Sequence, residues 1–161
     1  HVTDGVDLAH KYRLPHRLID FILEHHGTMI TRYQYSQALE NAGGDVRQVD
    51  IENFRYPGPA PRSRETAILM LADGTEARSR AMRPQNEMEL RSLVHKTVEA
   101  AQTNGQLNTT RLTLRDLHLI SESFVSTLRG SLHPRVEYPK DEGIPAIGRV
   151  PTKPREKVEI E

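Results

Sequence analysis

Two adjacent histidines and one aspartate are the residues whose types and placing best suit chemistry in this chain. His25 and His26 end a helix-like segment and precede Gly27, and Asp73 follows the apolar run of residues 67–72. Neutral imidazoles and carboxylates together form the ligand mixture that suits Mn, Fe or Zn ions. A site with too few protein ligands to close it leaves positions for water and substrate oxygens. The pattern therefore points to part of a metal site.

The segment before the histidines predicts how they are positioned. An apolar stripe at helical spacing runs along residues 15–26 and consists of Leu18, Ile19, Ile22 and Leu23. His26 lies four residues after Ile22, so the core-facing stripe is predicted to carry its ring inward, with His25 about 100° away. Gly27 is predicted to end the helix. A single inward histidine is more often a hydrogen-bonded core residue, but two adjacent ones fit that reading less well.

Asp73 is predicted to be a buried carboxylate on an apolar helix face. An ionised carboxylate in such a place costs several kcal/mol unless a cation or several donors compensate it. A metal ion would supply that compensation. An ion pair with Arg78 or Arg80 would supply it equally well, so both readings stay open from the residues alone.

Composition narrows the class of protein. The 161 residues are 36% hydrophobic and 27% charged and include no cysteine, which fits one disulfide-free domain of about 130 residues with a polar tail. The longest apolar run has six residues, so no transmembrane segment is predicted and any membrane contact must lie outside the chain. The net charge is zero, which removes the general electrostatic case for binding a nucleic-acid polymer.

Hydrophobic spacing predicts an almost entirely helical chain. The predicted helices span about residues 2–12, 15–26, 30–41, 64–82 and 86–103, with a last one beginning after Thr113. Residues 43–63 are predicted to form a loop, because three of the five positions from 57 to 61 are proline. Thr113 and Asp116 are spaced as an N-cap and an acidic N3 residue.

The two ends of the chain carry separate expectations. The sequence begins at His1 and enters a helical pattern at once, which predicts a piece of a longer protein. Residues 139–161 combine prolines, glycines and scattered charges, so they are predicted to form a disordered or peripheral tail. The predicted domain therefore covers residues 1–138.

Five blocks of the sequence resemble the HD domain of the seven-transmembrane HD hydrolases, a bacterial family that degrades cyclic di-AMP. The blocks are residues 1–5, 24–28, 54–59, 67–73 and 133–139, in the order found in the family. The resemblance implies an all-α, HD-domain phosphohydrolase-like helical bundle that is incomplete at its N-terminal side. It also implies the cytosolic domain of a membrane receptor.

The same resemblance implies two divalent metal ions, usually Fe or Mn. Their ligands follow the order His, His-Asp, His, His-His, Asp, of which this chain contains only the second half. His1, His25 and His26 would bind one metal and Asp73 the other. The implied reaction is hydrolysis of cyclic di-AMP to pApA by attack of a metal-bound hydroxide. Because the earlier ligands would precede residue 1, the isolated fragment is expected to be inactive.

Three residues are candidates for contact with the substrate, cyclic di-AMP. Arg80 lies seven residues after Asp73, two helical turns along the same face, where it could bind a phosphate or remain a solvated surface residue. Tyr35 could stack on a purine, worth roughly 1–3 kcal/mol, or pack in the core. Thr28 could orient a ligand or cap the next segment.

Two other functions remain open. The chain could belong to an HD phosphohydrolase for another nucleotide, such as cyclic di-GMP, or it could be a non-catalytic helical module that binds a nucleotide or a partner. The remaining histidines lack a metal-like spacing and are predicted to be surface or packing residues. They are His10, His16, His95, His118 and His133.

Overall fold

The computed structural model describes residues 1–130, which form helices joined by loops, with one isolated β-bridge and no strand in that range. The helices are α1 (Val2–Lys11), α2 (His16–Glu24), α3 (Arg32–Asn41), η1 (Val46–Gln48), η2 (Ile51–Phe54), α4 (Arg64–Met82), α5 (Glu87–Thr103) and α6 (Leu114–Arg129). The all-helical prediction is therefore confirmed. The predicted tail, residues 139–161, lies outside the described residues, as do the domain boundary at 138 and His133.

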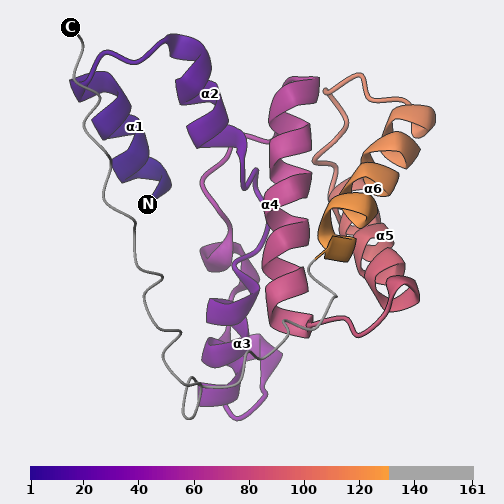
Figure 1. Cartoon of the computed structure of the whole chain (residues 1–161). Helices are drawn as coiled ribbons and strands as arrows, with labels where there is room; N and C mark the ends of the chain where they lie inside the picture. Colours follow the sequence, from indigo (N-terminus) through magenta and orange to yellow (C-terminus); the bar gives the residue numbers. More distant parts are fainter. Residues whose placement is uncertain (131–161) are drawn as a thin grey trace, which may run out of the picture.

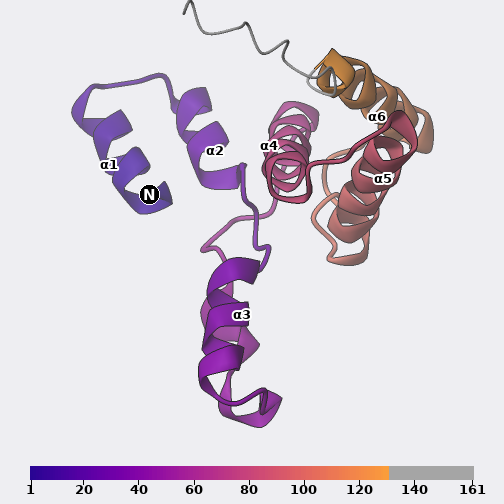
Figure 2. The same cartoon turned by 60° about the horizontal axis from the view of Figure 1, so that its bottom comes forward.

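The helices are arranged around α4. Figure 1 shows the α1 and α2 hairpin on one side of α4 and the pair α5 and α6 on the other. Figure 2 shows α3 projecting from the junction of these two parts. The chain runs outward through α3 and returns through η1 and η2. This arrangement brings the end of α2 beside the middle of α4.

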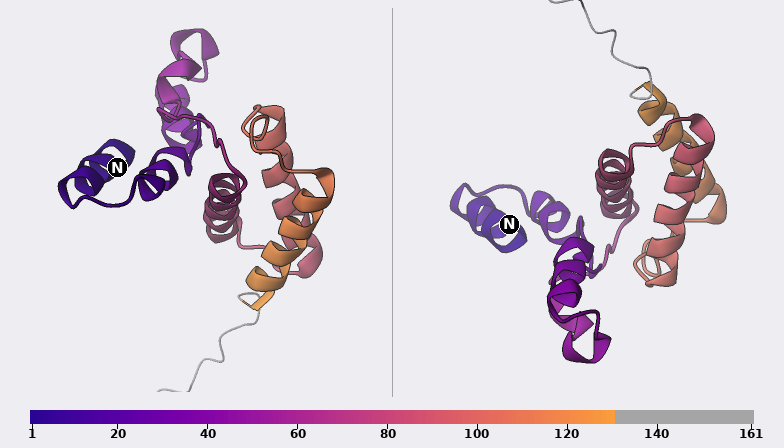
Figure 3. Two further views of the ribbon diagram at one scale, coloured as in Figure 1. Left: turned by 90° about the horizontal axis from the view of Figure 1, so that it is seen from above. Right: turned by 90° about the horizontal axis from the view of Figure 1, so that it is seen from below.

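The main core lies between α4, α5 and α6, which Figure 3 shows side by side from above and below. Its buried members are Met70, Leu71, Val98, Ala101 and Leu117, and a second cluster consists of Leu90, Val94 and Val125. Each large aliphatic side chain removed from water contributes about 1.5–3 kcal/mol. The rigid part of the fold is therefore α4 to α6, and α2 packs against it from outside.

Local capping sets where the long helices begin. The hydroxyl of Ser63 accepts a hydrogen bond from the backbone amide of Thr66, and the hydroxyl of Thr66 accepts one from the backbone amide of Ser63. These two bonds form a capping box at the start of α4. The predicted cap at Thr113 and Asp116 is confirmed, since each side chain accepts from the other's backbone amide. Such caps are worth about 1 kcal/mol each.

The helix carrying the histidines is shorter than predicted. It ends at Glu24, and His25 and His26 lie in the turn that follows. The predicted stripe is only partly correct, because Ile19 is buried but Leu18 is 45% exposed. The loop predicted for residues 43–63 includes two short 3-10 helices, η1 and η2, each capped by an aspartate. Within residues 1–130, no helix is long and apolar enough to cross a membrane.

Candidate metal site

Three histidines from two segments meet where α1 and the end of α2 approach each other. The Nε2 atoms of His1 and His26 are 2.9 Å apart. The rings of His25 and His26 have centroids 3.9 Å apart. One ring nitrogen from each of His1, His25 and His26 lies within 4.8 Å of the other two. The structure therefore brings together the three imidazoles that the sequence analysis assigned to one metal.

A hydrogen bond fixes the tautomer of His25, and an ion pair orients His26. The Nδ1 of His25 lies 2.8 Å from the carbonyl oxygen of Ile22, which can only accept, so this nitrogen carries the proton. The Nδ1 of His26 lies 3.2 Å from a carboxylate oxygen of Asp73, an ion-pair contact that favours a proton on this nitrogen. With the protons on Nδ1, the basic nitrogen of each neutral ring is Nε2. A ring fixed in this way by a carbonyl or carboxylate is the usual state of a metal-binding histidine.

Asp73 is not buried, contrary to the expectation from its apolar run. Its side chain is 43% exposed, while Ala67, Met70 and Leu71 fill the core from the same helix. The apolar run is one-sided, and Asp73 lies at the edge of its buried face. Among residues 1–130, the only ion pair of Asp73 is the one with His26, so neither Arg78 nor Arg80 is its partner.

The surroundings keep His26 neutral. Burial lowers the pKa of the His26 imidazole and the charge of His25 lowers it further, while Asp73 acts in the opposite direction. The ring of Tyr56 stacks on His26 with centroids 4.2 Å apart and planes inclined by 25°. Burial, together with the charge of Asp73, raises the pKa of the Tyr56 phenol. Tyr56 thus covers one face of His26 as a neutral aromatic group.

Glu24 holds the end of α2 against the start of α4, and sequence reasoning missed it. Its carboxylate is buried, with 1% of the residue exposed. It accepts from the Thr66 hydroxyl at 2.6 Å, from the Arg62 amide at 2.9 Å and from the Arg62 Nε at 2.7 Å. Burial raises the pKa of Glu24, but these hydrogen bonds outweigh burial and lower it overall. The residue beside the doublet is therefore an anchor.

Gly27 and Gln106 set the path of the chain after the doublet. Gly27 has φ +53°, and a Cβ there would lie 2.2 Å from Oε1 of Gln106. Gln106 is buried and bonds both the backbone amide and the hydroxyl of Thr28, each at 2.9 Å. The helix ends at Glu24 and not at Gly27 as predicted, and Gly27 instead lies in the turn that follows, where its positive φ and the close approach of Gln106 favour glycine. The structure uses Thr28 as an attachment point, and its predicted contact with a ligand remains untested.

A pocket of about 240 Å³ opens beside the doublet. Its polar wall consists of His25, His26, Asp73, Arg32, Arg78 and Tyr56. A second pocket of about 350 Å³ adjoins it and includes Tyr35, whose ring meets Phe54 edge-on. Arg80 lines neither of the two pockets, because it is 77% exposed and pairs with Glu76 at 3.1 Å. The structure therefore brings Arg78, and not Arg80, to the site.

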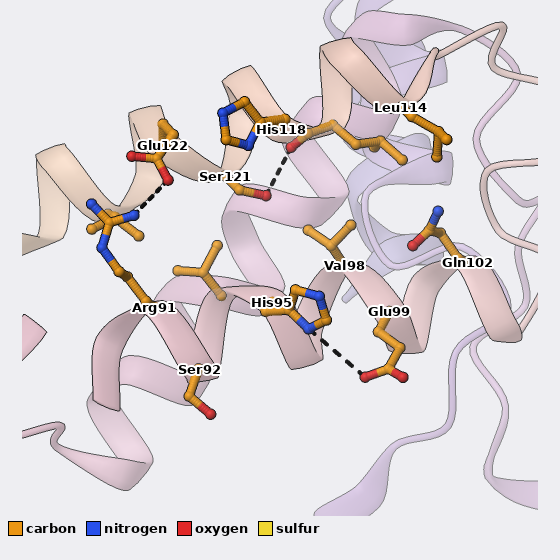
Figure 4. Close-up of a pocket in the computed structure, with 13 residues that line it drawn as sticks. Arg91, Ser92, His95, Val98, Glu99, Gln102, Leu114, His118, Ser121 and Glu122 are labelled. Atoms are coloured by element: carbon orange, nitrogen blue, oxygen red, sulfur yellow. Dashed lines mark hydrogen bonds and ion pairs between the residues drawn. The ribbon is translucent and has the colours of Figure 1, made fainter. Parts of the chain in front are cut away.

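A larger groove of about 500 Å³ between α5 and α6 offers a contrast, shown in Figure 4. Its ionic groups are paired with one another: Arg91 with Glu122, and His95 with Glu99 at 4.0 Å. His95 and His118 lie on this surface and are exposed, as are His10 and His16 elsewhere, in agreement with the sequence analysis.

The donor set fits a divalent ion. Two nitrogens bound to one ion at about 2.1 Å must lie within roughly 4 Å of each other, a condition that His1 and His26 satisfy. Both doublet rings keep a basic nitrogen, and Asp73 orients one of them. Asp73 lies at the other nitrogen of His26 and outside the three-histidine group. This is compatible with its predicted place in a second metal position.

No protein-family model matches the chain, but individual proteins do. The cyclic-di-AMP phosphodiesterase PgpH of Bacillus subtilis is 38% identical over 140 residues, which cover 87% of this chain and 19% of that protein. The PgpH of Listeria monocytogenes is 30% identical over 141 residues, covering 88% of this chain and 19% of that protein. A protein from Synechocystis is 40% identical over 142 residues, which cover 87% of this chain and 17% of that protein. The chain thus spans about a fifth of the length of these relatives.

The fold agrees with these matches. The crystal structure of the L. monocytogenes PgpH HD domain in complex with cyclic-di-AMP matches with a TM-score of 0.75 and 28% identity, over 86% of this chain and 63% of that one. A second crystal structure of the L. monocytogenes PgpH HD domain matches with a TM-score of 0.72 and 26% identity, over 83% of this chain and 60% of that one. The chain is therefore homologous to the HD domain of the PgpH phosphodiesterases and has its all-helical fold.

Proposed function

We propose that this chain supplies the His-His and Asp portion of a metal-dependent phosphodiesterase site that hydrolyses cyclic di-AMP to pApA. The observation that carries the proposal is the doublet itself. His25 is held through Nδ1 by the Ile22 carbonyl and His26 through Nδ1 by Asp73, an arrangement that leaves the Nε2 nitrogens for binding beside His1, at the edge of a pocket. Homology to proteins described as cyclic-di-AMP phosphodiesterases supports the choice of substrate.

His1, His25 and His26 would hold one divalent ion, and Asp73 would contribute to a second, with Fe or Mn as the expected metals. When bound, such ions lower the pKa of water and stabilise negative charge on phosphoryl oxygens. The chain's own residues would bind the ions and orient the side chains that hold them. Asp73 holds the ring of His26, and Tyr56 covers one face of that ring and shields it from water.

The two adjoining pockets would hold the nucleotide. They share Met29, Ile30 and Arg32 in their walls, so together they form an extended surface that leads away from the histidines. Tyr35 in the second pocket is available for a purine ring, whereas Thr28 acts through the turn that it anchors. Because the relatives are about five times longer than the chain, we also propose that this domain works on the cytosolic side of a longer membrane protein.

The test is hydrolysis by the protein expressed from its complete gene, with Mn²⁺ added. Cyclic di-AMP and cyclic di-GMP are offered separately, and products are separated by chromatography. His26→Ala should abolish conversion of cyclic di-AMP to pApA, whereas the exposed His118→Ala should retain it.

Each outcome assigns a function. Conversion of cyclic di-AMP alone supports the proposal. Preferential conversion of cyclic di-GMP would assign that nucleotide as the substrate and leave the proposed phosphodiester hydrolysis unchanged. Absence of turnover, with metal demonstrably bound by elemental analysis, would leave a non-catalytic module that binds a nucleotide.

A further inference from the structure

Two arginines share the pocket with the histidine site. Arg78 is half-buried on α4, five residues after Asp73, and Arg32 is the first residue of α3. Both line the pocket of about 240 Å³ that His25, His26 and Asp73 also line. Two arginines from separate helices therefore line one small cavity.

Neither arginine has a carboxylate partner among residues 1–130. Other arginines near the site do: Arg62 pairs with Glu24 at 2.7 Å, and Arg55 pairs with Glu52 at 2.6 Å. Arg32 and Arg78 make no ion pair or side-chain hydrogen bond within the described part of the chain. Arg32 is exposed, but Arg78 is partly buried, and a partly buried cation without a partner costs free energy that a bound anion would offset.

The two charges also act on each other. Burial lowers the pKa of the Arg78 guanidinium, and the positive charge of Arg32 lowers it further. Asp73 contributes the one carboxylate in the lining of this cavity, so the two arginines leave the lining with an excess of positive charge. Guanidinium groups match phosphate oxygens in geometry as well as in charge, because each can donate two parallel hydrogen bonds.

Resting on the function proposed above, we propose that Arg32 and Arg78 bind the second phosphate of the cyclic dinucleotide, the one that is not being hydrolysed. A cyclic dinucleotide carries two phosphodiesters on opposite sides of one ring. When one lies at the histidines, the other must lie a short distance along the same pocket. The two arginines provide the positive charge there.

The helical geometry of α4 explains why Arg78 reaches this position and Arg80 does not. The α4 residues that line the pocket are Met70, Leu71, Asp73, Gly74, Ala77 and Arg78. At 100° per residue they cover about 160° of the helix, with Asp73 at one edge. Arg80 aligns with Asp73 and falls just beyond that edge, where Glu76 holds it. Arg78 lies inside the arc, about 20° from its opposite edge at Leu71.

The test compares two substrates that differ in phosphate number, using the complete protein with Mn²⁺. Cyclic di-AMP has two phosphodiesters, whereas bis(p-nitrophenyl) phosphate has one. Arg78→Gln and the double variant Arg32→Gln/Arg78→Gln should raise KM for cyclic di-AMP about 10- to 100-fold, the range expected for lost charge-assisted hydrogen bonds. Turnover of bis(p-nitrophenyl) phosphate should stay within about twofold of wild type, since it lacks the group they bind.

Three further variants sharpen the result. Arg78→Lys keeps the charge but loses the paired donors, so its KM should lie between those of wild type and Arg78→Gln. Arg47→Gln is the matched control, because Arg47 is exposed and pairs with Asp45 away from the pocket. Arg80→Gln tests the candidate chosen from sequence. A rise in KM with Arg80→Gln and none with the Arg78 variants would overturn the proposal, as would an equal loss on both substrates.

A binding measurement separates failure of this proposal from failure of the proposed function. If wild-type protein hydrolyses neither substrate, the phosphodiesterase function fails. Calorimetric titration with pApA then tests the arginines without turnover. Binding that the double variant loses, and that weakens with rising salt, supports a phosphate site. Equal binding by wild type and double variant, or no binding by wild type, overturns it.

Discussion

Replacing Glu24 with alanine should destabilise the protein severely, because the Glu24 carboxylate is hydrogen-bonded to Arg62 and Thr66 in the interior. The change removes the acceptor for three donors on the loop before α4 and on α4 itself. Glu24 is 1% exposed and Thr66 is fully buried, so water cannot readily replace the lost partner there. The expected loss therefore exceeds that of an ordinary surface ion pair.

The structure sets the magnitude. A buried group left without its partner costs about 1–3 kcal/mol. The Thr66 hydroxyl keeps a weaker hydrogen bond to the Ser63 carbonyl at 3.3 Å. Its contribution to the lost stability therefore lies at the low end of that range. The Arg62 amide loses its carboxylate acceptor, while its guanidinium is 60% exposed and can be hydrated. Together these changes predict about 3 kcal/mol of lost stability and a Tm lower by roughly 10 °C.

Chemical denaturation followed by circular dichroism measures this directly. Glu24→Gln keeps one acceptor oxygen and should fall between wild type and Glu24→Ala. Glu65→Ala is the matched control, because Glu65 is exposed and forms an ion pair across the surface with Arg17. It should leave the unfolding midpoint nearly unchanged. A Glu24→Ala protein as stable as the Glu65→Ala protein would refute the view that this carboxylate anchors α2 to α4.

Three further perturbations have defined outcomes. Gly27→Ala should lower the free energy of unfolding by about 2 kcal/mol, because it combines a positive φ with a clash at Gln106, and denaturation of the variant checks this. Asp73→Ala should remove hydrolysis and reduce bound metal with little change in helicity, whereas His118→Ala should preserve all three, as measured by turnover, elemental analysis and circular dichroism. Mn²⁺ at 100 times its Kd should raise the free energy of unfolding by about 2.7 kcal/mol, and a chelator should reverse the gain. An unchanged Tm with Mn²⁺ would show that the folded chain holds no metal.

The helices could be predicted from sequence because their signals are local. The span Arg64–Met82 was predicted to the residue, and the cap at Thr113 and Asp116 was identified from spacing alone. The helix before the doublet was predicted to end two residues too late. Turns at helix ends depend on how the next segment is held, and Gln106 holds this one from 78 positions away along the chain.

The histidines that the structure brings together were predicted from the sequence, but the residues and the burial around them were not. The meeting of His1, His25 and His26 agrees with the resemblance, and their role as ligands remains a proposal. Burial of Asp73 was inferred from an apolar run, but a run of six spans more than one helical turn and cannot say which face is covered. Glu24 was missed because its partners lie 38 and 42 residues away. No sequence spacing signals such a contact.

The attachment of α1 has a thermodynamic consequence. In the described residues α1 packs mainly against α2, with only Val2 and Ala9 of α1 buried, so little apolar surface holds it in place. His1 precedes this weakly held helix, whereas Asp73 lies on α4, the helix that packs into the main core. A ligand that joins His1 to His26 would close a loop whose ends are 25 residues apart and act as a reversible cross-link. Binding of a ligand at the site and folding of α1 are then thermodynamically coupled, so that binding stabilises the folded helix and folding of the helix strengthens binding.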